Sequence, residues 1–291
     1  LNGIGKAILS DVIFQSSRGD GIGGSAVYAQ SVGSVSVVGG GINGCSSTVT
    51  LDDSSTAYYV GGALFLSKVT NISISTVTFR KNAVICGGGG GARGGAAMSM
   101  YEFQNASVST SVFEGNSLSG GNGGAIYASQ GTSLAISSSS FTLNDVSLSS
   151  ASSENAGTGG GAIATSSVAK SFFDGCKFSN NSVSTRGQGA GGAIHVYSPA
   201  GITGTQQAII SGCSFVFNSA QSAGGVAFTG RFDYIQISST IFQRNECIVE
   251  IGATIRGGAV MVEDGANVAL NDTQFLWNYG MSGGAVYAAA D

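Results

Sequence analysis

The sequence has little proline, little charge and few of the residues that most often build catalytic centres. Proline, tryptophan and histidine occur once each in 291 residues, as Pro199, Trp277 and His195. Only 10% of the residues are charged, the formal net charge is −4, and lysine and arginine form no cluster. Nucleic-acid binding needs clustered basic side chains to displace counterions, so this class of function is excluded.

Long apolar runs are absent too. None reaches the ~18 residues that a membrane-spanning helix needs, so we expect no membrane span in this segment. The chain opens at Leu1 without an initiator methionine or a signal peptide, which indicates a mature or excised fragment.

What the chain does have is 48 glycines and a 42% share of hydrophobic residues. A disordered chain would carry more charge and fewer apolar residues. Glycine and serine alone would suggest a flexible linker. The apolar residues recur at fixed intervals, however, which argues against a linker and for an internal repeat.

Two short motifs alternate along the chain. Gly-Gly-Ala-aliphatic begins at Gly61, Gly94, Gly123, Gly160, Gly191, Gly257 and Gly283, with variants at Gly24 and Gly224. Phe-x-x-Asn pairs Phe79 with Asn82, Phe113 with Asn116, Phe141 with Asn144, Phe178 with Asn181, Phe215 with Asn218, Phe242 with Asn245 and Phe275 with Asn278. Phe14 with Ser17, and Ile42 with Cys45, look like eroded copies.

The spacing of the motifs distinguishes a fixed arc from a variable one. The first glycine precedes the phenylalanine by 18 residues in most copies, by 19 from Gly94 and by 24 from Gly191, where the extra residues surround Pro199. The gap from the asparagine to the next glycine varies from 5 to 16 residues. A solenoid rung behaves in this way, because its strands must stay in register while its loops tolerate insertion.

The segments before each phenylalanine, such as 72–79 and 108–113, alternate apolar residues with serine and threonine, which is typical of β-strands. We therefore predict an all-β fold: a single-stranded right-handed parallel β-helix of about nine rungs of ~33 residues, continuous over residues 1–291 and roughly 43 Å long. Glycine should supply positive φ at the corners. The phenylalanines should stack, and the asparagines should form a hydrogen-bonded ladder and tolerate left-handed backbone geometry.

The two motifs resemble those of the polymorphic outer-membrane protein repeats, best known from chlamydial surface autotransporters. The resemblance covers essentially the whole chain, from Phe14 to Val286. It implies a right-handed β-helix passenger that is exposed on a cell surface and that often acts in adhesion.

An enzyme needs a constellation that the sequence does not offer. Glycoside cleavage requires two carboxylates facing one cleft. The adjacent acidic pairs are Asp52-Asp53 and Glu263-Asp264, and neither is aligned with an acid in a neighbouring repeat. We therefore predict no enzymatic activity, no catalytic or metal-binding residues and no cofactor.

His195 lies in a slot, four residues past the first glycine, that otherwise holds mainly aromatic residues and methionine. The other occupants are Tyr28, Phe65, Met98, Tyr127, Ala164, Phe228, Met261 and Tyr287. A lone histidine is a poor ligand or base, so we expect a structural role. If the preceding aliphatic residue faces inward, the row faces outward and could bind sugar rings or a partner. The favoured alternative is that long loops cover the row or that it points into the core.

Cysteines and sequons supply further candidate sites. Cys176 and Cys213 lie two residues before their phenylalanines in successive repeats, and should stack as two thiols or as a disulfide. Cys45 and Cys86 are a second candidate pair, with Cys247 left over. Candidate glycosylation sites are Asn71, Asn105, Asn180 and Asn271, although abundant serine and threonine would produce about four sequons by chance.

Neither terminal repeat carries a recognisable cap, so we expect other subunits or further repeats of the same chain at both open ends. The leading functional hypothesis is an extracellular or cell-surface structural or adhesive rod, within a filament, appendage or cell coat, with glycans as further partners. An adhesin-type autotransporter passenger that binds a host ligand is the alternative. A polysaccharide-degrading enzyme is the distant third.

Overall fold

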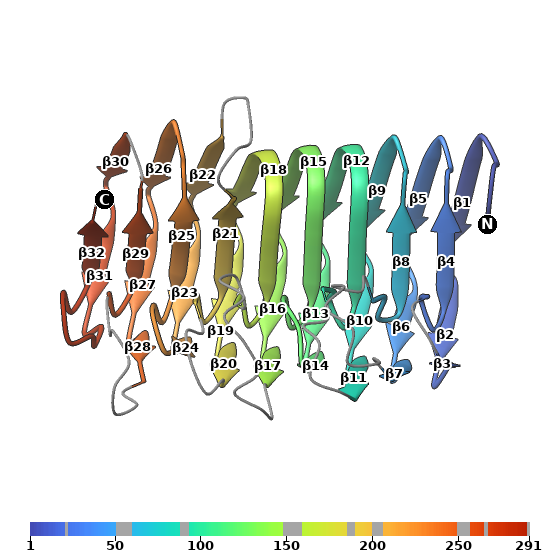
Figure 1. The fold of residues 1–291 in the computed structure, drawn as a ribbon, viewed down its shortest axis with the longest axis horizontal. Coiled ribbons are helices and arrows are strands. Elements are labelled where there is room, and N and C mark those ends of the chain that lie inside the picture. Colours follow the sequence, from blue (N-terminus) through green and yellow to red (C-terminus); the bar gives the residue numbers. More distant parts are fainter. Residues whose placement is uncertain are drawn as a thin grey trace.

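The chain forms one coil of stacked parallel strands. The computed structural model describes residues 1–20, 23–50, 60–87, 93–147, 159–184, 190–199, 206–248, 257–264 and 267–289. In these ranges every regular element is a β-strand, and each strand pairs in parallel with its equivalent one turn further along. The turns advance in a right-handed sense from the N-terminal to the C-terminal end (Figure 1). The predicted right-handed parallel β-helix is confirmed.

A rung has four strand segments, which form four rows along the rod. The Gly-Gly-Ala strands follow the glycine motif: β4 (Val27–Gln30), β8 (Leu64–Ser67), β21 (Ile194–Ser198), β25 (Val226–Gly230), β29 (Val260–Glu263) and β32 (Val286–Ala289). The alternating strands come next: β1 (Lys6–Ser10), β5 (Ser34–Val38), β9 (Asn71–Ser75), β22 (Gln207–Ser211), β26 (Tyr234–Ser238) and β30 (Val268–Asn271). In three rungs these two rows are continuous: β12 (Met98–Ser109), β15 (Ile126–Ser137) and β18 (Ile163–Asp174).

The other two rows contain shorter strands. The Phe strands are β2 (Ile13–Gln15), β6 (Gly41–Asn43), β10 (Thr78–Arg80), β13 (Val112–Glu114), β16 (Ser140–Thr142), β19 (Lys177–Ser179), β23 (Ser214–Val216), β27 (Ile241–Gln243) and β31 (Gln274–Leu276). The Asn strands follow each ladder position: β3 (Arg18–Asp20), β7 (Ser46–Thr50), β11 (Ala83–Gly87), β14 (Ser117–Ser119), β17 (Asp145–Ser147), β20 (Ser182–Ser184), β24 (Ser219–Ala220) and β28 (Glu246–Cys247).

These rows make three parallel sheets. Because β12, β15 and β18 span two rows without a break, the Gly-Gly-Ala strands and the alternating strands belong to one 15-stranded sheet. The Phe strands form a nine-stranded sheet and the Asn strands an eight-stranded sheet. The nine Phe strands correspond to the nine predicted rungs.

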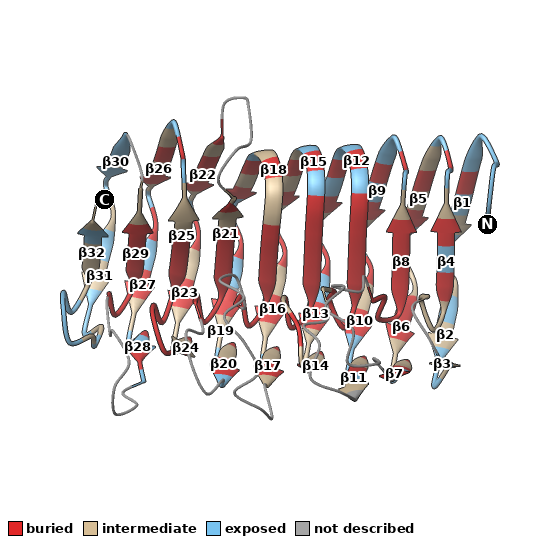
Figure 2. Cartoon of the chain, in the orientation of Figure 1, coloured by how far each residue is buried: buried red, intermediate tan, exposed pale blue. Residues whose placement is uncertain are grey.

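The register aligns each phenylalanine with the next. Phe79 pairs with Phe113 and, on its other side, with Ile42, which confirms that Ile42 replaces a phenylalanine. From Phe79 to Phe275 successive rings stack with centroids 4.6–5.2 Å apart and ring planes within 9° of parallel. Each stacked pair contributes about 1 kcal/mol beyond the burial of its surface. Figure 2 shows the buried residues filling the middle rungs, with more exposure at the two ends of the rod.

Two predicted register positions are wrong by one residue. Met98 pairs with Leu64 and Ile126, and Phe228 pairs with Val196 and Val262. Both side chains are therefore fully buried inside the coil, and the outward slot falls to Ser99 and Ala227. A shift of one residue exchanges the two faces of a strand, and the apolar side chains of Met98 and Phe228 settle the choice. In the first case the aligned motif starts at Gly95, which restores the spacing of 18 residues.

The corners of the coil use left-handed backbone geometry, as predicted for some glycine corners but one residue earlier than predicted at the Phe-x-x-Asn corner. Gly123 has the predicted positive φ of +88°, whereas its neighbour Gly124 is needed for close approach, because a Cβ there would collide with the carbonyl oxygen of Gly161. At the Phe-x-x-Asn corner the asparagine is not left-handed. The residue before it is: Ser16, Gly44, Lys81, Gly115, Leu143, Asn180, Phe217, Arg244 and Trp277 all have φ between +52° and +61°.

Two substitutions at this corner should change the stability of the fold in opposite directions. Gly115 has room for a methyl group, since the nearest atom to its Cβ would be Lys81 Cγ at 3.7 Å, so Gly115→Ala should cost about 1–2 kcal/mol through backbone strain alone. Leu143 is exposed in the same geometry, and Leu143→Asn should stabilise the fold by about 0.5–1 kcal/mol. Urea denaturation measures both changes. Equal effects of the same sign would contradict the assigned corner.

Candidate functional site

The central feature of the molecule is a ladder of buried asparagines that runs along the rod axis. Successive side chains from Asn82 to Asn278 are linked by Nδ2–H···Oδ1 hydrogen bonds of 2.9–3.0 Å. The ladder residues are Asn82, Asn116, Asn144, Asn181, Asn218, Asn245 and Asn278. All but the last are fully buried. The predicted ladder is confirmed.

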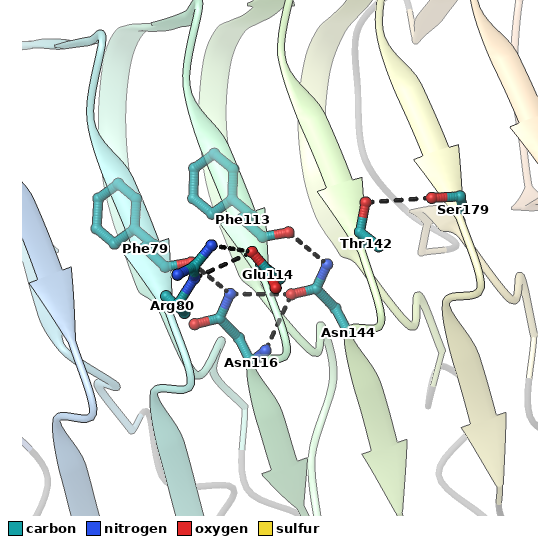
Figure 3. A network of polar contacts seen from close by, with 8 residues as sticks. All are labelled: Phe79, Arg80, Phe113, Glu114, Asn116, Thr142, Asn144 and Ser179. Atoms are coloured by element: carbon teal, nitrogen blue, oxygen red, sulfur yellow. Dashed lines mark hydrogen bonds and ion pairs between the residues drawn. The ribbon is translucent and has the colours of Figure 1, made fainter.

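The side chain of each ladder asparagine in the middle rungs makes four hydrogen bonds, as Asn144 illustrates. Its Oδ1 accepts bonds from the backbone N–H (3.1 Å) and the Nδ2 (2.9 Å) of Asn116. Its Nδ2 donates to Asn181 Oδ1 at 2.9 Å. The same Nδ2 donates to the Phe113 carbonyl oxygen at 3.0 Å, and Figure 3 shows this bond together with those from Asn116. An asparagine side chain has two donors and two lone pairs, so its hydrogen-bonding capacity is fully used. The network therefore ties three successive rungs together at every step.

A second polar ladder lies two residues before the phenylalanines. Its members are Ser111, Ser139, Cys176, Cys213, Thr240 and Thr273. Ser139 Oγ, for example, accepts the Ser111 N–H at 3.1 Å and donates to the Ser137 carbonyl oxygen at 2.8 Å. The same pattern places the Cys176 N–H 3.3 Å from Cys213 Sγ. A small side chain with both a donor and an acceptor is therefore what this position requires.

The structure places Cys176 and Cys213 as stacked neighbours, as predicted. All five cysteines lie in the described residues, and all are thiols. The hydrogen bond with Cys176, together with burial, raises the pKa of Cys213 far above its ordinary value. Protonated thiols fit the ladder, because Cys213 Sγ donates to the Ser211 carbonyl oxygen at 3.3 Å. Oxidation of the pair to a disulfide stays a prediction.

The second candidate disulfide is not supported by the register. Cys45 occupies an asparagine slot, where its N–H donates to Asn82 Oδ1 at 3.0 Å. Cys86 pairs with Val49, four residues further along the Asn strands. The two cysteines are thus offset by about 13 Å along the strand direction, well beyond the ~7 Å Cα limit for a disulfide. Burial raises the pKa of the Cys86 thiol to about 12, which makes it unreactive near neutral pH.

Only one of the two candidate acidic pairs, Glu263-Asp264, lies in the described part of the chain. Asp52-Asp53 lies outside the described residues. Glu263 ends β29, and Asp264 occupies a corner with φ of +57°. In the described part of the chain no group of three or more histidine, cysteine or acidic side chains is arranged to hold a metal ion. Nor does that part contain a helix long and apolar enough to cross a bilayer.

The outward row around His195 is covered. Phe65, Tyr127 and Met261 are buried in it, and Tyr28, at the N-terminal end, is partly exposed. The favoured alternative for this row, that it is covered, is therefore correct. His195 is itself buried, with Nε2 2.7 Å from Thr229 Oγ1 and with Nδ1 lacking a hydrogen-bond partner. Burial lowers its pKa to about 4.

The four sequon asparagines are all exposed. Asn71 and Asn105 lie side by side in adjacent rungs, where Asn105 Nδ2 donates to Asn71 Oδ1 at 3.2 Å. Asn180 lies on the left-handed corner and Asn271 at the end of β30. Their exposure is compatible with glycan attachment, and glycosylation itself stays a prediction.

One exposed cluster was not predicted from the sequence. Phe217, Arg244 and Trp277 follow one another along the left-handed corner of the last rungs, and all three are exposed. The signal was available, because each residue directly precedes the asparagine of a Phe-x-x-Asn motif. Aligning the motifs would have placed them in one column.

No family model, no curated protein and no solved structure matches the chain. The resemblance to the polymorphic outer-membrane protein repeats therefore depends on the two motifs alone.

His195 predicts a pH dependence of stability. Its pKa is 6.5 in the unfolded chain and about 4 in the folded protein, so the unfolded state binds more protons between these values. The free energy of unfolding is therefore unaffected by the protonation of His195 above pH 6.5. It decreases by roughly 3 kcal/mol as the pH falls towards 4, because the unfolded chain takes up the proton first. His195→Met, which places the Met261 side-chain type in the same row, should remove this loss. Urea denaturation at neutral and mildly acidic pH measures it, and parallel pH profiles for the two proteins would disprove the assignment.

Proposed function

We propose that this chain is a stiff rod segment of an extracellular or cell-surface structural or adhesive protein, within a filament, appendage or cell coat. The observation that carries the proposal is the buried asparagine ladder, which continues from Asn82 to Asn278 beside the stacked phenylalanines. A coil held together by contacts between each rung and the next transmits force along its axis and keeps its length. These are the properties that a spacer or filament needs.

Two further observations support a location outside the cell. The first is that the motifs resemble surface-exposed passenger repeats. The second is the polarity of the outward surface. Where β9 pairs with β12, the outward positions are Asn71, Ser73, Ser75, Asn105, Ser107 and Ser109, which are polar and uncharged. Such a surface is soluble without strong electrostatic attraction to other macromolecules.

The ends of the rod are proposed sites of continuation. At one end β1, β2 and β3 each lie at the edge of their sheets, and Ile13 is largely exposed there. At the other end β31 is an edge strand, and Phe275 has a stacked partner on one face only among the described residues. Open edges pair readily with further strands. Further repeats of the same chain or another subunit would continue the sheets and both ladders.

An adhesin-type passenger is the second candidate, favoured by the exposed cluster of Phe217, Arg244 and Trp277. Exposed aromatic side chains grouped beside a charged one are typical of binding surfaces. The two candidates share the rod and differ in whether its side binds a ligand. A polysaccharide-degrading activity has no such supporting observation.

Labelling of intact source cells tests the proposed location. Antibodies raised against residues 1–291 should label unpermeabilised cells in immunogold electron microscopy, and the labelled structures should be filaments or a coat. External protease should remove the label while a cytoplasmic marker stays intact. Label that appears only after permeabilisation would rule out the extracellular rod. Purified protein provides a matched check on shape, because X-ray scattering should give a rod about 43 Å long for nine rungs.

A further inference from the structure

One corner of the coil exposes a column of large side chains that the rod itself does not need. Phe217, Arg244 and Trp277 occupy equivalent positions in three successive rungs, directly before ladder asparagines. Phe217 is 47% exposed and Trp277 is 71% exposed. They therefore contribute little to the core.

These residues keep strained backbone geometry without burying their side chains. Phe217, Arg244 and Trp277 have φ of +56°, +52° and +53°. Left-handed geometry is unfavourable for residues with a Cβ, and a bulky side chain there is uncommon. Gly115 and Asn180 fill the same corner in other rungs with residues suited to it. The same geometry recurs in the rungs of exposed Lys81 and Leu143, so the backbone at this corner is set by the coil. The coil does not require two aromatic residues and an arginine in three successive rungs, and this choice of side chains is what points to a function.

The three side chains form an ordered group. The guanidinium carbon of Arg244 lies 5.4 Å from the ring centroid of Phe217 and 5.3 Å from that of Trp277. Both distances are within the range of cation–π attraction, so the two rings hold the guanidinium between them. Among the described residues no carboxylate forms an ion pair with Arg244. Its N–H donors are left to face solvent.

We infer that this corner, the Phe217–Arg244–Trp277 cluster, is a binding site for an acidic polysaccharide. A guanidinium is planar and donates two parallel hydrogen bonds to a carboxylate or a sulfate. The exposed edges of two aromatic rings beside it offer apolar contact for the C–H surfaces of a sugar. Sugar polymers that carry acid groups combine both features, whereas nucleic acids and anionic membranes would need many more basic residues than this chain supplies.

The neighbouring groups refine the site. Gln243 is half-buried next to Arg244 and adds an amide, while Tyr279 and Leu276 extend the exposed apolar surface. Glu246 is exposed two residues beyond Arg244 and would oppose a polyanion. The inference goes beyond the proposed rod function, because a rod needs no ligand on its side. Its failure would leave the rod proposal unaffected.

Binding to defined polysaccharides tests the site. The purified chain should bind immobilised polygalacturonate, dextran sulfate or both, more weakly at higher salt, and should not bind neutral dextran. Binding to polygalacturonate alone would identify a carboxylate ligand, and binding to dextran sulfate alone a sulfated one. No binding to either polyanion, or equal binding to neutral dextran, would overturn the inference.

Asparagine substitutions locate the binding without harming the fold. Arg244→Asn should weaken binding about tenfold, and Phe217→Asn and Trp277→Asn about fivefold each. Asparagine suits this corner, so thermal denaturation should show no loss of stability in any of them. Arg244→Lys keeps the charge but loses the fork, and should still bind more weakly than the native chain. Glu246→Gln should bind more tightly.

Leu143→Asn is the matched control, since it makes the same change in the same corner two rungs before the first residue of the cluster. Its affinity for the polyanions should equal that of the native chain. An equal loss of binding in Leu143→Asn and Arg244→Asn would place the ligand elsewhere and overturn the site.

Discussion

The rod depends on burying uncharged amides that can each make four hydrogen bonds. An amide inside a protein is costly unless every donor and acceptor has a partner. The axial repeat solves this for the asparagines, because each rung supplies the acceptor for the rung before it and the donors for both neighbours. These hydrogen bonds thereby fix the register of each rung relative to the next. A slip of one residue would leave a column of buried amides without partners and would turn the phenylalanines outward.

This constraint divides each rung into an arc of fixed length and an arc of variable length. The Phe strand, the ladder asparagine and the corner before it must repeat at one spacing, whereas the region between β21 and β22 accepts an insertion after Pro199. The outward positions are also free, and they range from the ion pair of Arg80 with Glu114 to the hydrogen-bonded Thr142 and Ser179 (Figure 3). Function can therefore vary on the surface while the ladder stays the same.

The sequence predicted the coil, the phenylalanine stack and the asparagine ladder, because spacing alone determines which motifs align. It placed Met98 and Phe228 on the wrong face, since glycine and alanine are nearly interchangeable at the glycine corner and leave the register open by one residue. Cys45 and Cys86 looked adjacent because both follow a Phe-x-x-Asn corner, but aligning Cys45 with Asn82 places Cys86 four residues further along the Asn strands, as the structure shows. The Phe217–Arg244–Trp277 cluster could have been predicted, because each member directly precedes the asparagine of a Phe-x-x-Asn motif; what the sequence could not give is the packing of the guanidinium between the two rings.

Breaking the ladder at one position tests the central claim most directly. Asn144→Leu, with nearly the same volume, would leave the buried Asn116 N–H without its acceptor. It would also remove one of the two acceptors of Asn116 Nδ2, which keeps the Phe79 carbonyl oxygen, and the side-chain donor to the Phe113 carbonyl oxygen. The free energy of unfolding should fall by about 3 kcal/mol or more, and the Asn116 amide should lose protection in hydrogen exchange. Asn180→Gly, an exposed change in the next rung, serves as the control and should have little effect. If Asn144→Leu unfolds with the stability of the native chain, the ladder does not hold the rod together.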